Sequence, residues 1–455
     1  MMSLSKFEEM LKTNDVYFFD TTEFEEIIHY YLDDGNTSMA KKAVYLALEQ
    51  HPDSADIKLI QAEIMVFEDK LTEARLLLDN LLAIYPYNDE VYIQIANLLS
   101  KDDKHKEAID FLVKAKEYTD DLADVSALLG MEYLYLDDYE KSREHFSVCL
   151  DFDIEDYQAL YNIIYCFEME SCHIEAITFL EDYINKNPYC EVAWHQLGRQ
   201  YFVLKDYKRA LKAFDYAVVI DEAFIGGYVE KAKTLEKLDR YDEAIENYQI
   251  TLELDDPTAF AYLQIGECYK KKNNATKAIY YYKKALHEDP LLDKGWMLLA
   301  IVCNEEKAYD KALHYLNKAI ALDETNVIYW RYNGEINLRL KFYEEAAEAF
   351  EKCIELDDSG VDVWITLSDI WIFTGDFFRA LNVLVRAKKQ HHNFAEIEYR
   401  LGCIFFITDQ KKEAYLHLKT ALSLDYEYHL VMQELYPTVF EDLKVKRMVL
   451  NFLEN

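Results

Sequence analysis

The sequence is poor in the residues that interrupt helices. Its 455 residues include only 11 glycines and 6 prolines. We find no alternation of apolar and polar residues between turn signals that would indicate a strand, so we predict an all-α chain. The sequence also lacks an apolar stretch of membrane-spanning length, and its first residues lack the apolar core of a signal peptide. We therefore predict no membrane association and a cytoplasmic location.

Clustered cysteine and positive charge are also scarce. The eight cysteines are spread singly, which does not resemble a disulfide framework and fits a reducing compartment. Lysine and arginine total 49 against 85 acidic residues, which gives a formal charge of −36. Nucleic acid binding needs clustered cations that replace the counterions of a polyanion. This composition therefore argues against nucleic acid and favours a protein partner with basic or mixed charge.

The sequence does contain a repeat with a period of 34 residues. Ala210 belongs to a column of small residues at this interval, and the column consists of Ala40, Ala74, Ala108, Ser142, Ala176, Ala210, Ala244, Ala278, Ala312, Ala346, Ala380 and Ala414. A second small column includes Gly198 and is interrupted by Ile28 and Ile164. A constant period of this length predicts a stacked array of similar units.

Each unit reads as a hairpin of two helices. In residues 191–224, apolar residues recur at helical spacing on both sides of the polar break "LKDYKRA". Asp206 stands where its side chain could cap the second helix. We predict that the small residues Gly198 and Ala210 let the helices approach closely, and that large side chains fill the gaps. The predicted filling side chains are those of Trp194, Tyr201 and Phe214.

The spacing W-x2-L-G-x2-Y followed by A-x3-F resembles the tetratricopeptide repeat, and the resemblance covers about residues 21–428. It implies an α-α superhelix, a right-handed solenoid of antiparallel helical hairpins. We predict an N-terminal capping helix in residues 1–20, twelve tandem units in residues 21–428, and C-terminal capping helices in residues 429–455.

The sequence shows no set of residues that suggests catalysis. There is no glycine-rich phosphate loop and no Gly-x-Ser-x-Gly elbow. Cys172 and His173 are adjacent, but they fall in a predicted turn with nothing to supply an oxyanion hole. We predict a non-enzymatic protein with no cofactor, no metal site and no catalytic residue.

The resemblance implies that the first helix of each unit lines an inner wall, where partner segments bind. In repeats 5–10 the predicted contact residues are Tyr161, Tyr165, His195, Arg199, Phe202, Lys233, Lys237, Leu263, Lys270, Lys271, Arg331 and Arg339. Between residues 191 and 360, eight basic residues stand at inner positions against four acidic ones. We predict a protein or peptide partner whose bound segment carries carboxylates and an aromatic or aliphatic anchor.

Two alternatives remain open from the sequence. The inner basic residues could simply offset acidic residues of their own repeats, with nothing bound there. The array could instead self-associate as a structural or assembly scaffold, for example as a homo-oligomer, through apolar residues of the C-terminal repeats. The residues considered for this contact are Ile365, Ile372, Phe373, Tyr399, Phe406 and Ile407.

Overall fold

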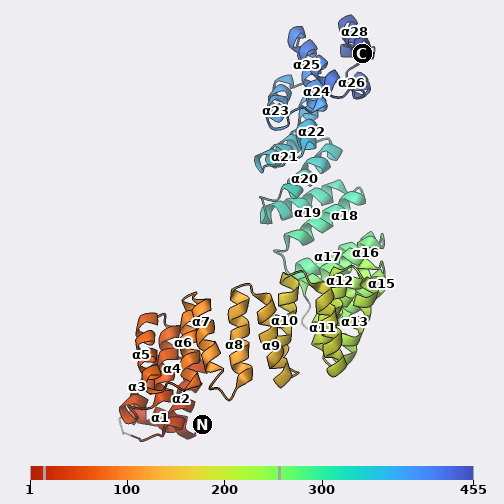
Figure 1. The fold of residues 1–455 in the computed structure, drawn as a ribbon. Coiled ribbons are helices and arrows are strands. Elements are labelled where there is room, and N and C mark those ends of the chain that lie inside the picture. Colours follow the sequence, from red (N-terminus) through yellow and green to blue (C-terminus); the bar gives the residue numbers. More distant parts are fainter. Residues whose placement is uncertain (1, 14–16, 255–257, 454–455) are drawn as a thin grey trace. The chain divides into compact units, whose positions relative to one another are not determined.

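The computed structural model describes residues 2–13, 17–254 and 258–453, and these residues form helices and turns without any strand (Figure 1). The prediction of an all-α chain of helical hairpins is confirmed. The predicted ranges for the caps and the repeats also include residues 1, 14–16, 255–257 and 454–455, which lie outside the described residues.

Helices α2 to α25 follow the 34-residue period, and each pair is joined by a short turn. The pairs are α2 (Thr21–Asp33) with α3 (Thr37–Gln50), α4 (Ala55–Phe67) with α5 (Leu71–Ile84), α6 (Asp89–Lys101) with α7 (His105–Ala115), α8 (Leu122–Tyr135) with α9 (Tyr139–Phe152), α10 (Tyr157–Met169) with α11 (His173–Lys186), α12 (Glu191–Val203) with α13 (Tyr207–Ile220), α14 (Ile225–Lys237) with α15 (Tyr241–Leu254), α16 (Ala259–Lys271) with α17 (Ala275–Glu288), α18 (Asp293–Glu305) with α19 (Tyr309–Leu322), α20 (Val327–Leu340) with α21 (Tyr343–Glu355), α22 (Val361–Phe373) with α23 (Phe377–Gln390), and α24 (Ala395–Ile407) with α25 (Lys411–Leu424).

The turn inside each hairpin contains one residue at positive φ, and in at least five of the hairpins a side chain then caps the second helix. Lys205 has φ 62° and is followed by Asp206, whose Oδ1 accepts a hydrogen bond from the backbone N–H of Arg209 at 3.1 Å. Asp376 caps α23 in the same way. The predicted capping role of Asp206 is confirmed, and it explains how the second helix can begin without proline or glycine.

The small columns are gaps filled by large side chains, as predicted. A Cβ atom added at Gly198 would lie 2.5 Å from the ring of Phe214, and one at Gly334 would lie 2.7 Å from Phe350. Trp194 is half-buried and packs against the core cluster that contains Ala210 and Phe214, and its ring also lies against Tyr216, with centroids 4.4 Å apart. Its indole Nε1 donates a hydrogen bond to the backbone oxygen of Pro188 at 2.9 Å.

The chain divides into two compact units, Met1–Thr234 and Leu235–Asn455. Within each unit the core is a series of local clusters that span consecutive hairpins. One cluster in the second unit, for example, runs from Ala346 through Trp364 to Ile404. Stability in such an array comes mainly from contacts between neighbouring hairpins.

Three helices follow the last hairpin, namely α26 (His429–Leu435), α27 (Pro437–Phe440) and α28 (Leu443–Leu453), and α1 (Met2–Thr13) precedes the first. Val439 and Phe440 pack with Tyr399 and Cys403 of α24 in one buried cluster. The helix that begins at His429 ends before Pro437, because proline lacks the N–H that a continuing helix needs.

Candidate partner-binding surface

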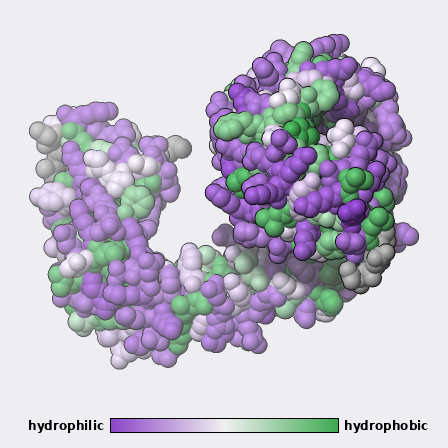
Figure 2. Space-filling model, turned by 90° about the horizontal axis from the view of Figure 1, so that it is seen from above, coloured by the Kyte–Doolittle hydropathy of each residue, from purple (hydrophilic) through white to green (hydrophobic). Residues whose placement is uncertain are grey.

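Helix α10 exposes a row of large side chains on one side. Tyr157, Tyr161, Tyr165 and Met169 are 37%, 44%, 47% and 49% exposed, respectively. Residues four apart lie one turn apart on the same helical face, so these four side chains form a continuous row, which we call the α10 ladder. Most of the visible face in the space-filling view is hydrophilic, with hydrophobic residues in separate patches (Figure 2). An unbroken row of this kind is therefore a candidate contact surface.

A polar network connects the helix of the ladder to α12. Glu168 accepts a hydrogen bond from Gln200 Nε2 at 2.8 Å, and its Oε1 lies 3.5 Å from Nη2 of Arg199. Arg199 remains exposed. Phe202, one turn further along α12, is half-buried and packs edge-on against Tyr207, with centroids 5.3 Å apart. Three of the predicted contact residues, Tyr161, Tyr165 and Arg199, therefore lie on two neighbouring helices, α10 and α12, that are linked through Glu168.

The ring of His195 packs between two aromatic side chains and carries no charge at neutral pH. Its half-buried ring lies between Phe214 and Phe224, with centroid distances of 5.7 and 5.1 Å, and neither ring nitrogen has a hydrogen-bond partner in the described part of the chain. Burial lowers the pKa of His195 to about 4. The imidazole is therefore neutral at pH 7 and adds nothing to the positive charge of the predicted wall.

Leu263 does not reach the surface that the sequence assigned to it. Its side chain is 4% exposed and belongs to a core cluster with Tyr282, Leu298 and Leu299. The following hairpin covers this position of α16. We therefore leave Leu263 out of the proposed binding surface.

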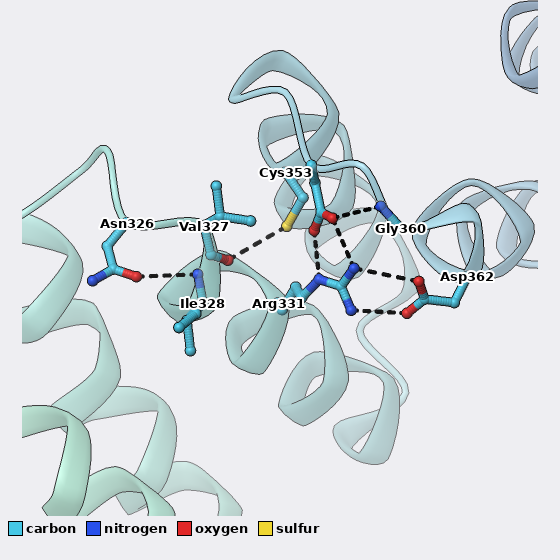
Figure 3. Close-up of polar contacts among 8 residues, drawn as sticks. Asn326, Val327, Ile328, Arg331, Cys353, Gly360 and Asp362 are labelled. Carbon is cyan, nitrogen blue, oxygen red and sulfur yellow. Dashed lines mark hydrogen bonds and ion pairs between the residues drawn. The ribbon is translucent and has the colours of Figure 1, made fainter. Parts of the chain in front are cut away.

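Arg331 is engaged by its own chain (Figure 3). Its guanidinium forms two hydrogen bonds with Asp358, and Nη1 lies 2.8 Å from Oδ2 of Asp362. The backbone N–H of Gly360 donates to Asp358 at 2.9 Å, which helps to hold this carboxylate in place. The two carboxylates raise the pKa of Arg331 and lower that of Asp358. The charge of Arg331 is therefore neutralised within the array.

Other predicted cations differ in their surroundings. Lys233 lies 2.7 Å from Glu230, and Lys270 lies 3.8 Å from Glu305. Lys237, Lys271 and Arg339 are exposed, and the guanidinium of Arg339 lies 5.8 Å from the ring centroid of Tyr309. Local acids thus offset part of the predicted cationic wall, as one of the alternatives from the sequence anticipated.

Most of the apolar C-terminal residues considered for self-association are covered by the chain itself. Tyr399 is buried, and its hydroxyl donates to the backbone oxygen of Asp425 at 2.8 Å. Ile365, Ile372 and Phe406 are half-buried. Phe373 and Ile407 remain exposed at 71% and 41%, respectively.

The cysteines in the described residues are unpaired, and seven of the eight are buried. Burial raises the pKa of Cys149 to about 11 and that of Cys353 to about 12, so these thiols are protonated at neutral pH. Nδ1 of His173 lies 2.9 Å from Oε1 of Gln200, which gives this imidazole a structural partner beside Cys172. No helix in the described ranges is long and apolar enough to cross a membrane.

Comparisons with known proteins agree with the repeat architecture. The family model described as tetratricopeptide repeat matches residues 229–292 and 296–360. Anaphase-promoting complex subunit 3 of Schizosaccharomyces pombe is 27% identical over 158 residues. That match covers 35% of this chain and 24% of the relative, so the chain corresponds to about a quarter of the length of this relative.

Solved structures with similar helical arrangements include MamA, with 20% identity, 36% of this chain and 95% of that chain covered, and a TM-score of 0.34. The protein YrrB, whose structure is described as a TPR protein with an unusual peptide-binding site, has 16% identity, coverage of 39% and 91%, and a TM-score of 0.33. The hetero-tetramer Cut9–Hcn1 has 13% identity, coverage of 90% and 92%, and a TM-score of 0.36.

The family match covers residues 229–292 and 296–360, and the same 34-residue hairpin recurs from α2 to α25, so the chain is built of tetratricopeptide-type repeats. This repeat architecture supports a protein-interaction scaffold.

Proposed function

We propose that this protein is a non-catalytic scaffold that binds a segment of a partner protein on the α10 ladder. The main support for this proposal is a row of four exposed side chains on one face of α10. Each of them is more than one-third exposed, and they are Tyr157, Tyr161, Tyr165 and Met169. Burying the exposed part of each side chain would contribute about 1 kcal/mol. Arg199 and Phe202 on α12 extend the surface, and Arg199 can pair with a carboxylate of the partner.

The proposal also includes three more of the predicted contact residues, the terminal caps and the cellular location. Lys237, Lys271 and Arg339 are candidate contacts for acidic groups of a partner. Helix α1 and helices α26 to α28 are proposed as caps of a twelve-unit array over residues 21–428. We propose a cytoplasmic protein that binds neither nucleic acid nor membrane. The similarity to a subunit of the anaphase-promoting complex supports a protein as the ligand class.

The proposal is tested by replacing Tyr161 and Tyr165 with serine in the full chain. Partner proteins captured from the native lysate should be lost from this variant, because the central part of the ladder is removed. The matched control replaces Tyr45 and Tyr189, which are 63% and 80% exposed elsewhere, with serine. Equal capture by both variants would place binding on another surface.

A further inference from the structure

A second surface, formed by residues of α20 to α23, combines aromatic side chains with negative charge. A groove of about 550 Å³ is lined by residues of α21 together with Trp330 of α20 and Trp371 of α22. Four glutamates line it, namely Glu344, Glu348, Glu351 and Glu355, against Lys352 and Arg379. The groove therefore combines aromatic rings with an excess of negative charge.

The cations of the chain itself account for only part of this negative charge. Glu351 lies 3.3 Å from Arg386, and Glu355 lies 2.6 Å from Lys352. Glu344 and Glu348 are exposed and form no ion pair or hydrogen bond within the described part of the chain. They are four residues apart on α21, so both carboxylates lie on the same helical face, one turn from each other.

One guanidinium of the chain itself already lies in the groove, and another stacks on an indole nearby. Arg379 lies over the ring of Trp371, with 4.6 Å between its guanidinium carbon and the ring centroid, and Arg386 lies 5.2 Å from the centroid of Trp364. Such stacking is attractive because the ring face is electronegative, and it suits planar guanidinium better than a hydrated ammonium. Phe378, 80% exposed, adds apolar surface to the adjoining part of the groove.

We propose that this groove docks an arginine-bearing segment of another protein. An incoming guanidinium pairs with Glu344 and Glu348 while its plane and methylene groups contact the half-buried indole of Trp330, because Trp371 is 9% exposed and covered by Arg379. The charge of −36 over the whole chain favours the approach of such a basic segment. This site is independent of the α10 ladder, since the two surfaces share no residue.

The test titrates the full chain with a heptapeptide that carries arginine at its first, fourth and seventh positions and alanine elsewhere. Binding should weaken about fivefold or more in the E344Q/E348Q variant. The matched control is E140Q/E144Q on α9, which changes exposed residues at the same positions of another repeat and removes the same charge, without neighbouring indoles. This control should bind the peptide like the original protein.

A second readout does not depend on the variants. The chain has five tryptophans, and in an NMR titration the indole N–H signals of Trp330 and Trp371 should shift more than those of the other three. A lysine version of the peptide should bind more weakly than the arginine version. Equal loss of binding in both double variants, no loss in either, or equal shifts of all five indole signals would overturn the proposal.

Discussion

Single residues in the hairpin turns adopt a backbone conformation that most side chains avoid. Each of the twelve described turns has one residue at positive φ, and only Gly35 and Gly375 among these twelve are glycine. The others are aspartate, asparagine, serine or lysine, as at Lys205. Aspartate and asparagine tolerate this region better than other residues with side chains. A polar turn with neither glycine nor proline is therefore compatible with this fold.

Replacing Gly375 with alanine should destabilise the protein by about 1 kcal/mol. The glycine has φ 83°, and an added Cβ atom would meet no other atom within 4 Å, so the cost comes from the backbone alone. Urea unfolding followed by circular dichroism measures it. Gly375→Asn should cost less, because asparagine enters this region more readily, and an alanine variant as stable as the original protein would contradict the account.

His195 should make stability depend on pH. Its folded-state pKa of about 4 lies below its ordinary value of 6.5, mainly because of burial, with Glu230, Arg199 and Lys233 as charged neighbours. The unfolded chain therefore takes up a proton before the folded chain as the pH falls from 6.5 to 4. The contribution of His195 should lower the free energy of unfolding by on the order of 1 kcal/mol at pH 5.

The matched comparison is His195→Phe, which keeps an aromatic ring between Phe214 and Phe224 and removes the titration. Unfolding free energies measured at pH 5 and pH 7 should differ less in this variant than in the original protein. The same difference in both proteins would show that the imidazole of His195 titrates normally in the folded state.

Residue positions in the repeat predicted which side chains could face a partner but not how each one is used. Tyr161 and Tyr165 were predicted, whereas Tyr157 and Met169 were not selected, although their four-residue spacing from these tyrosines is readable in the sequence. The burial of Leu263 depends on packing against the next hairpin. The pairing of Arg331 depends on Asp358 and Asp362, which come 27 and 31 residues later. A rule that assigns residues by their position within one repeat cannot predict either the burial of Leu263 or the pairing of Arg331, because both depend on residues outside the helix concerned.

At the scale of helices, the 34-residue period of the small residues was enough to predict the helical hairpins and how the two helices of each hairpin pack. Gly198 and Phe214 come from the two helices of one hairpin and meet at its closest approach. The same pairing recurs between Gly130 and Phe146 and between Gly334 and Phe350. Because these pairs lie within one repeat, a single period reveals them. The additional ring contact between Trp194 and Tyr216 was not predicted from the sequence.

Gly198 and Phe214 should be energetically coupled. Gly198→Ala should destabilise the protein by about 1–3 kcal/mol, because the new methyl group would overlap the ring of Phe214. Phe214→Leu should also destabilise, by opening a cavity. The double variant should lose less stability than the sum of the two, by at least about 0.5 kcal/mol. Additive losses in urea unfolding would mean that the two residues do not share one gap.

At the scale of the molecule, local packing coexists with a large excess of negative charge. Each compact unit contains its own hydrophobic clusters, and 85 acidic residues face 49 basic ones. Exposed ion pairs contribute little to stability, so the net repulsion among like charges should dominate the response to salt.

Raising sodium chloride from about 10 to 150 mM shortens the Debye length from roughly 30 to 8 Å. We expect the thermal midpoint at pH 7 to rise by roughly 2–4 °C, since screening weakens the repulsion. Scanning calorimetry measures this change. The control is the same pair of scans near pH 4.7, the isoelectric point, where the effect should shrink. A midpoint that falls with salt at pH 7 would contradict this view.

The most direct test of the account places a photo-crosslinking amino acid at position 161, on the α10 ladder, and at position 189, an exposed tyrosine on another surface. Irradiation in living cells, followed by mass spectrometry, identifies the proteins joined to each position. The account predicts a partner segment joined at position 161 and absent at position 189. The same proteins joined equally at both positions, or none joined at position 161, would contradict the claim that the α10 ladder binds a partner.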